Sequence, residues 1–199
     1  MARPQAEDYG DKRQAILDAA AALFARIGYA HAKLADVARA CGATKSMLYH
    51  YFPAKEDVLF AIIRDHAEGN LAALEQVLAR AAPPEERLHA LVATWVRRSL
   101  SARAGHAVLM YDLKFLPPRQ HRAIVDVERR MIERVGELVA EVNPALRRGR
   151  PPQQKTYALL LFGMLNWTET WFRSSGPLSP EEMAERIFRL FLHGLAAER

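Results

Sequence analysis

The chain has 199 residues, of which half are hydrophobic, with a formal net charge of +5 and a single cysteine. This length allows one domain or two small ones with a sizeable core, and the positive charge fits an anionic partner without identifying it. One cysteine excludes an internal disulfide and a cysteine metal cluster. Because the N-terminus lacks an apolar signal core and no apolar run could span a bilayer, we expect a cytoplasmic protein without membrane contacts.

The sequence predicts an all-α fold of about nine helices. Ala, Leu and Arg are frequent, and no run of alternating β-branched residues suggests a strand. Residues 1–10 are polar and are expected to be loosely ordered. Apolar stripes at helical spacing, separated by Gly and Pro, predict the positions of the helices. The first four are Asp11–Gly28, two short helices within Ala35–Phe52, and Lys55–Ala79. The fifth runs from Pro84 to a break near Ala104-Gly105, the sixth from there to Phe115, the seventh from Pro118 to about Val142, the eighth over Gln153–Arg173, and the last begins at Pro180.

The segment Ala35–Phe52 is the centre of the prediction. Gly42 suits the left-handed residue that ends a helix, and Thr44 is a good N-cap for the next one. A helix, a short turn with glycine and a second helix form the unit that places its second helix in the DNA major groove. From Thr44 to Tyr51 there are hydroxyls and cations but no acid, as expected of a surface that lies against phosphates. A solvated helical hairpin is the alternative that this segment alone leaves open.

Lys12–Ile62 resembles the tetracycline-repressor (TetR) family of bacterial regulators. The resemblance rests on many residues at fixed spacing, namely Ile16, Leu17, Ala19, Ala20, Leu23, Phe24, Gly28, Tyr29, Asp36, Val37, Ala38, Cys41, Gly42, Leu48, Tyr49, His50, Tyr51, Phe52, Lys55 and Glu56. It implies a helix-turn-helix DNA-binding domain over residues 1–54 and an effector-binding and dimerisation domain over residues 55–199.

The resemblance assigns expected DNA contacts to specific positions. Thr44 caps the recognition helix, with a phosphate contact as a second role, and Lys45 and Ser46 lie where base edges are within reach. Tyr49 is expected to contact phosphate or a thymine methyl group. For His50 a merely solvated side chain fits equally well. The complete expected set is Lys33, Thr44, Lys45, Ser46, Met47, Tyr49, His50, Tyr51 and Lys55.

Two departures from the family pattern involve three residues. Ala32 and Lys33 stand where a Thr and a second hydroxyl residue usually begin the first short helix, so an N-cap oxygen is absent at Ala32, which costs about 1 kcal/mol. Lys33 would replace a neutral phosphate donor by a cation. Met47 replaces a small hydroxyl residue and would change which bases are read.

The resemblance also implies a homodimer formed through the last two helices, with Gly163 and Gly194 allowing close helix approach. The helix Gln153–Arg173 is hydrophobic almost all round in its first half, which predicts a centrally buried position. Two-fold symmetry would place two recognition helices about 34–36 Å apart on a palindromic operator, and the protein would act as a repressor.

A shorter resemblance suggests the class of effector. The Asn-Trp pair Asn166-Trp167, followed by Trp171 and Arg173, and the Leu-Pro-Pro run Leu116–Pro118, resemble TetR-type regulators that respond to acyl-CoA thioesters. The expected effector residues are Trp95, Met110, Tyr111, Phe115, Phe162, Asn166, Trp167, Trp171 and Arg173, with Arg147, Arg148 or Arg150 beside them for the CoA phosphates. An ordinary core beside a solvated basic loop, or a pocket for a free hydrophobic or aromatic drug, are the alternatives.

The sequence does not predict an enzyme. Its seven histidines are scattered and form no metal-ligand spacing, and there is no phosphate-binding glycine loop or nucleophile elbow. We therefore expect no catalytic residue, no cofactor and no metal site. A structural helical adaptor is a third class, but it would leave the polarity of Thr44–Tyr51 without an explanation.

Overall fold

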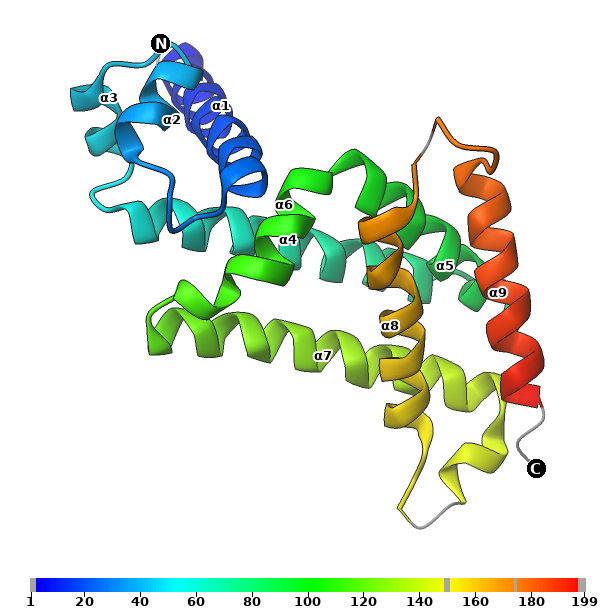
Figure 1. Cartoon of the computed structure of the whole chain (residues 1–199). Coiled ribbons are helices and arrows are strands. Elements are labelled where there is room, and N and C mark those ends of the chain that lie inside the picture. Colours follow the sequence, from blue (N-terminus) through cyan, green and yellow to red (C-terminus); the bar gives the residue numbers. More distant parts are fainter. Residues whose placement is uncertain (1–2, 149–150, 174, 197–199) are drawn as a thin grey trace. The chain divides into compact units, whose positions relative to one another are not determined.

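The computed structural model describes residues 3–148, 151–173 and 175–196. Within these residues the chain forms nine α-helices, two short 3₁₀ turns and no strand, as the sequence predicts (Figure 1). The elements are α1 (Arg3–Ile27), α2 (Leu34–Ala40), α3 (Lys45–Tyr51), α4 (Lys55–Leu78), α5 (Pro84–Ser101), α6 (Arg103–Asp112), η1 (Leu113–Phe115), α7 (Pro118–Val142), η2 (Pro144–Arg147), α8 (Gln154–Trp171) and α9 (Pro180–Ala196). In the part of the chain that is described, no helix is both long and apolar enough to cross a membrane.

The chain divides into two compact units. The first comprises residues up to Ala67 together with Ala104–Ile124, and the second comprises Glu68–Arg103 together with residues from Val125 onward. The unit boundaries therefore fall inside α4, after the first residue of α6 and inside α7, and α6 from Ala104 onward belongs to the first unit.

The first unit contains the helix-turn-helix segment. α1 packs on α2, and α2 packs on α3 (Figure 1). Ile16, Ala20 and Phe24 repeat at helical spacing along α1 and are buried, and Val37 of α2 and Leu48 of α3 complete the core.

α1 begins earlier than the sequence predicts. It starts at Arg3, whereas residues 1–10 are expected to be loosely ordered and the helix to start at Asp11. Pro4 is compatible with this earlier start, since a first-turn residue needs no N–H donor. The expected end is confirmed, because Gly28 follows α1 with φ +79°.

The second unit has its own core, in which α5 packs against α8 and α9 (Figure 1). The buried face of α5 holds Leu88, Leu91, Val92 and Trp95 at helical spacing. Pro84 occupies the first turn of α5, as predicted.

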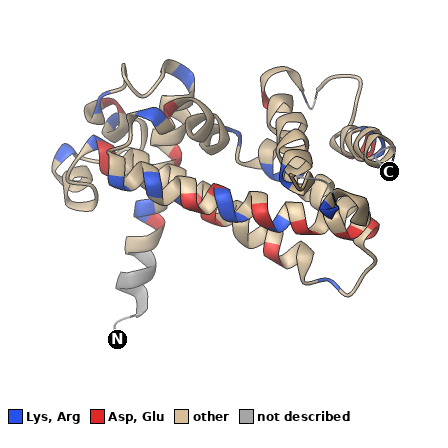
Figure 2. Cartoon of the chain, turned by 90° about the horizontal axis from the view of Figure 1, so that it is seen from below, with Lys and Arg blue, Asp and Glu red and all other residues tan. Residues whose placement is uncertain are grey.

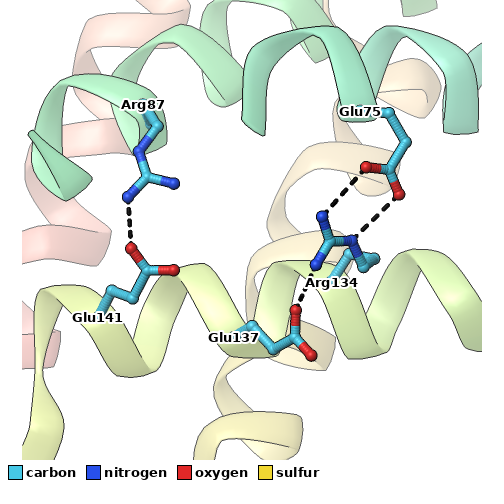
Figure 3. Close-up of polar contacts among 5 residues, drawn as sticks. All are labelled: Glu75, Arg87, Arg134, Glu137 and Glu141. Carbon is cyan, nitrogen blue, oxygen red and sulfur yellow. Dashed lines mark hydrogen bonds and ion pairs between the residues drawn. The ribbon is translucent and has the colours of Figure 1, made fainter. Parts of the chain in front are cut away.

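Ion pairs join α4 and α5 to α7 in the second unit (Figure 3). The Arg134 guanidinium donates to both carboxylate oxygens of Glu75, at 3.1 Å each, and also to Glu137. Arg87 donates to Glu141. Acidic and basic residues are interspersed along α7, as on a solvated helix face. Figure 2 shows that residues of both charges are spread over the helices of the chain.

Two further boundaries differ from the expectation. The break after α5 lies at Ala102 instead of near Ala104-Gly105, and these two residues are inside α6. The residue before α2 is Lys33, not Ala32, and its side chain makes no cap bond. Ala32 is instead packed in the core, so the site of the missing cap oxygen is Lys33.

The expectation that α8 is centrally buried holds for one face alone. Ala158, Leu161 and Leu165 are buried, but Leu159 and Leu160 on the other face are 47% and 55% exposed. A helix that is apolar all round needs a cover for each of its faces, and within one chain α5 and α9 cover only part of α8.

Candidate nucleic-acid interface and effector site

The turn between α2 and α3 fixes the start of α3. Gly42 has φ +66°, a conformation that L side chains rarely adopt, and Ala43 N donates to Ala38 O at 2.9 Å. Thr44 then caps α3, because its Oγ1 accepts a hydrogen bond from Met47 N at 3.1 Å. The predicted glycine and N-cap are both found.

The outward face of α3 carries the residues that the sequence assigns to DNA. Lys45, Ser46, Tyr49 and His50 are exposed. The Lys45 ammonium lies 5.8 Å from the Tyr49 ring centroid, so these two side chains share one face one turn apart. Leu48 anchors the opposite face in the core. This face has cations, hydroxyls and an aromatic ring, with no carboxylate to repel a phosphate.

The remaining assigned residues lie near this helix with varied exposure. Thr44 and Lys33 are exposed, whereas Met47 and Tyr51 are half-buried. Tyr51 is in contact with two rings, His50 at 5.7 Å and Tyr9 at 4.5 Å between centroids. Tyr9 lies in the stretch that the sequence treats as loosely ordered, so the sequence analysis did not find this contact.

Lys55, at the start of α4, is already engaged within the first unit. Its ammonium lies 4.0 Å from the centroid of the Tyr29 ring, and burial lowers the pKa of this lysine. Tyr29 donates its hydroxyl to Glu56 Oε1 at 3.0 Å. Burial, followed by this hydrogen bond, raises the pKa of Tyr29.

A buried carboxyl group completes this cluster. Asp112, the last residue of α6, is buried, and burial raises its pKa. A hydrogen bond from the Tyr29 backbone and the charges of Lys114 and Lys55 act in the opposite direction. The Phe115 ring lies 5.3 Å from that of Tyr29. The end of α6 is thus attached to the loop between α1 and α2.

The predicted effector residues other than Arg173 lie in three places. Trp95, Phe162 and Asn166 come together between α5 and α8: the Trp95 and Phe162 rings are 4.8 Å apart, and Trp95 Nε1 donates to Asn166 Oδ1 at 3.1 Å. Met110, Tyr111 and Phe115 are exposed on α6 and η1 in the first unit.

Trp167 and Trp171 lie on the other face of α8. They are 67% and 51% exposed and line a groove of about 670 Å³ between α8 and α9. The groove wall is almost entirely apolar, and its residues are Leu159, Leu160, Gly163, Met164, Trp167, Thr168, Trp171, Leu178, Met183, Arg186, Ile187 and Leu190.

The arginines expected near the effector are exposed at the ends of elements. Arg173 follows α8 and donates to Phe172 O at 3.1 Å, while Arg147 and Arg148 lie at η2. Arg150 lies outside the described residues.

A set of polar residues near Trp95 is not among those predicted from the sequence. Arg98, one turn further along α5, donates to the buried Asn70 of α4 at 2.8 Å. A Cβ at Gly69 would approach Arg98 Nη2 to 2.8 Å, so this guanidinium lies directly over the α4 backbone. Among the described residues no acidic side chain pairs with Arg98. The one sequence signal for Arg98 is its i, i+3 spacing from Trp95, which places both side chains on the same face of α5.

The titratable residues do not suggest a metal centre. In the described ranges no three His, Cys, Asp or Glu side chains are arranged to hold a metal ion. Cys41 is half-buried, and its thiol donates to Ala38 O at 3.5 Å, which suits a packing role.

Two family profiles match the chain. One, described as "Bacterial regulatory proteins, tetR family", matches residues 16–62, and the other, described as "Tetracyclin repressor-like, C-terminal domain", matches residues 81–195. Together they cover both the helix-turn-helix unit and most of the helices that follow.

Individual proteins are similar over nearly the whole chain. The "HTH-type transcriptional repressor KstR2" of Rhodococcus jostii is 26% identical over 204 residues, covering 99% of this chain and 98% of its own. A TetR-family transcriptional regulator from Bordetella parapertussis has a TM-score of 0.85 at 36% identity, covering 90% of this chain and 93% of its own. AibR, solved with isovaleryl coenzyme A and operator DNA, has a TM-score of 0.78 at 26% identity, covering 90% and 97%.

Proposed function

The chain belongs to the TetR family of bacterial regulatory proteins, and we propose that it is a repressor that binds a palindromic operator as a homodimer. The proposal includes release from DNA by a CoA thioester. The observation that carries the DNA-binding part is the outward face of α3, which is acid-free, capped by Thr44 and anchored through Leu48. As a DNA-binding regulator, the protein would act in the bacterial cytoplasm.

On α3 we assign base contacts to Lys45 and Ser46, because they lie in the first turn where base edges are within reach. Tyr49 follows on the same face and would meet a phosphate or a thymine methyl group, and Met47 would influence which bases fit. His50 and Tyr51 would contact the DNA backbone. Lys33 and Lys55 would add phosphate contacts at the ends of neighbouring helices, although Lys55 must then leave or share its position over Tyr29.

The groove between α8 and α9 supports the proposed dimer. Leu160, Trp167 and Leu190 are 55%, 67% and 69% exposed, and an apolar patch of this kind normally requires a cover. A second copy of the chain would supply it by a symmetric contact of the same helices. A Cβ at Gly163 would meet no atom within 4 Å, so the space above this glycine is open to a partner helix.

For the effector we propose a CoA thioester of a carboxylic acid. Trp95, Phe162 and Asn166 form an apolar cluster with one polar group, and Arg98 lies one turn from Trp95 with an amide as its partner. Such a cluster suits contact with an acyl group, and the exposed Arg147, Arg148 and Arg173 suit the phosphates of CoA. AibR, which was solved with isovaleryl coenzyme A, supports this class of effector.

Release requires that the effector favours one conformation over another. We propose that α6 carries the signal, because its last residue Asp112 and the following Phe115 contact Tyr29 in the loop before α2. Tyr29 in turn contacts Lys55 and Glu56 at the start of α4. A shift of α6 would therefore move the residues that hold α2, α3 and α4 together.

The effector proposal is tested by titrating an operator complex. Native mass spectrometry first detects any ligand that co-purifies with the protein. The complex is then titrated with a panel of acyl-CoA thioesters beginning with isovaleryl-CoA, with the matched free acids, and with free CoA. We expect dissociation by a thioester alone. If the free acid dissociates the complex equally well, the thioester proposal is wrong and a free hydrophobic effector takes its place.

A further inference from the structure

The first turns of α1 reach the recognition helix α3. The Tyr9 ring lies on the Tyr51 ring, with centroids 4.5 Å apart and planes at 30°. Tyr51 also meets His50 edge-on at 5.7 Å, so the three rings form a row at the C-terminal end of α3. The Tyr9 contact exists because α1 begins at Arg3, and thus extends before the stripe that packs against α2.

α3 depends on such outside contacts. It has seven residues, all described, and of these only Leu48 is buried. A helix this short is unstable on its own, so its orientation is set by what holds its two ends. Thr44 holds the N-terminal end.

The C-terminal end of α3 is held from α1. Besides the Tyr9 contact, the Arg13 guanidinium lies 5.6 Å from the centroid of Phe52, the residue that follows α3. Arg13 is itself fixed by Asp65 of α4 at 3.3 Å. Two residues one turn apart on α1 thus contact two successive residues at the end of α3.

We infer that Tyr9 is a positioning residue for DNA recognition: its ring holds Tyr51 and the last turn of α3 in the orientation that DNA requires. The inference rests on the proposed DNA-binding function. The matched DNA-binding profile begins at residue 16, so Tyr9 lies outside it. Fixing Tyr51 before DNA arrives lowers the entropic cost of ordering that side chain at the interface. Tyr9 acts through Tyr51. Because its ring is uncharged, it displaces no counterion from DNA.

The test measures operator affinity in a double-mutant cycle. The operator duplex is isolated by the wild-type protein from a random-sequence library, and dissociation constants are measured by fluorescence anisotropy at several salt concentrations. The variants are Tyr9→Ala, Tyr9→Leu, Tyr9→Phe, Tyr51→Ala and the Tyr9→Ala/Tyr51→Ala pair. Gln14→Ala, at another exposed position of α1, is the control. A thermal melt of each variant separates loss of binding from loss of folding.

We expect Tyr9→Ala and Tyr9→Leu to weaken binding about three- to tenfold, the range of an aromatic pair, with an unchanged salt dependence. Tyr9→Phe and the Gln14→Ala control should bind as the wild type does. In the Tyr51→Ala background, Tyr9→Ala should have no further effect, since its partner is already missing.

Three results would overturn the inference. Wild-type affinity of Tyr9→Ala and Tyr9→Leu would show that the contact is dispensable. Equal losses in Tyr9→Phe and Tyr9→Ala would indicate a direct contact by the Tyr9 hydroxyl, and additive losses in the cycle would show that Tyr9 does not act through Tyr51. If the wild-type protein selects no DNA, the proposed function fails and the inference fails with it.

Discussion

At the residue scale, a few side chains fix the candidate recognition surface. Gly42 provides the left-handed turn, Thr44 caps α3, and Leu48 anchors it. All three could be predicted from sequence, because each acts on residues within a few positions of itself. Tyr9 and Asp112 could not, since their partners Tyr51 and Tyr29 are distant along the chain. These two contacts arise from the packing of α1 and α6, so no pattern in the neighbouring sequence indicates them.

The cap on α3 gives the first prediction. Replacing Thr44 by Ala removes the acceptor for Met47 N and should lower the free energy of unfolding by about 1 kcal/mol. Urea unfolding followed by circular dichroism measures this loss. Thr44→Ser keeps the hydroxyl and is the matched control. If Thr44→Ser lowered the free energy of unfolding as much as Thr44→Ala does, the hydroxyl would not be acting as a cap.

Asp112 gives a prediction on pH. Burial raises its pKa in the folded state, so the folded protein binds a proton here more tightly than the unfolded chain does. The contribution of Asp112 to the free energy of unfolding is complete below the pKa that Asp112 has in the unfolded chain. It is lost as the pH rises through the pKa that Asp112 has in the folded protein. Asp112→Asn keeps an acceptor for the Tyr29 backbone but cannot ionise.

The stability of Asp112→Asn relative to wild type should therefore increase over the interval above the ordinary aspartate pKa of about 3.9, as measured by urea unfolding at a series of pH values. Asp126→Asn, which alters an exposed carboxylate on α7 that pairs with Arg129, is the control. A relative stability that falls over this interval would show that Lys55 and Lys114 outweigh burial at Asp112.

At the element scale, helix positions follow from the sequence better than helix faces do. Prolines at the starts of α5, α7 and α9 and glycines after α1 and α2 mark boundaries, because these residues act on the backbone directly. The start of α1 at Arg3 could not be predicted, because the polar residues before Asp11 form no apolar stripe. The sequence predicts that α8 is apolar but does not separate its buried face from its exposed face, because apolar residues repeat at helical spacing on both faces.

Substitutions at the starts of α3 and α4 should change DNA binding in different ways. Lys45→Ala removes a proposed base contact, so it should lower affinity for the preferred sequence more than for others; a good base contact is worth about 1–3 kcal/mol. Lys55→Ala removes a proposed phosphate contact, so it should lower affinity for all sequences and reduce the salt slope by about 1. Gel shifts with operator and scrambled duplexes at several salt concentrations separate the two. Matching profiles for both variants would refute this division.

At the scale of the whole molecule, the proposed repressor needs a second copy of the chain. The α8–α9 groove exposes Leu160, Trp167 and Leu190 together, and this arrangement is unfavourable in an isolated protomer. Leu160→Glu would place an unpaired charge in the proposed interface. We expect the variant to be monomeric at micromolar concentration by light scattering, whereas the wild type is dimeric.

Ile27→Glu is the matched control for this experiment. It introduces the same charge at an exposed apolar residue at the end of α1, outside the groove, and should leave the dimer intact. A wild-type protein that is itself monomeric would contradict the proposed assembly, and so would a Leu160→Glu variant that stays dimeric.

Selection of DNA by the wild-type protein from a random-sequence duplex library tests whether a dimer of this chain reads DNA through α3. Two α3 helices related by two-fold symmetry should enrich an inverted repeat whose half-sites are centred about 34–36 Å, or one helical turn, apart. Lys45→Ala should blur the preference within each half-site and leave the spacing unchanged. Enrichment of no sequence, or of a single half-site without its inverted copy, would contradict the account of a dimeric repressor that reads DNA through α3.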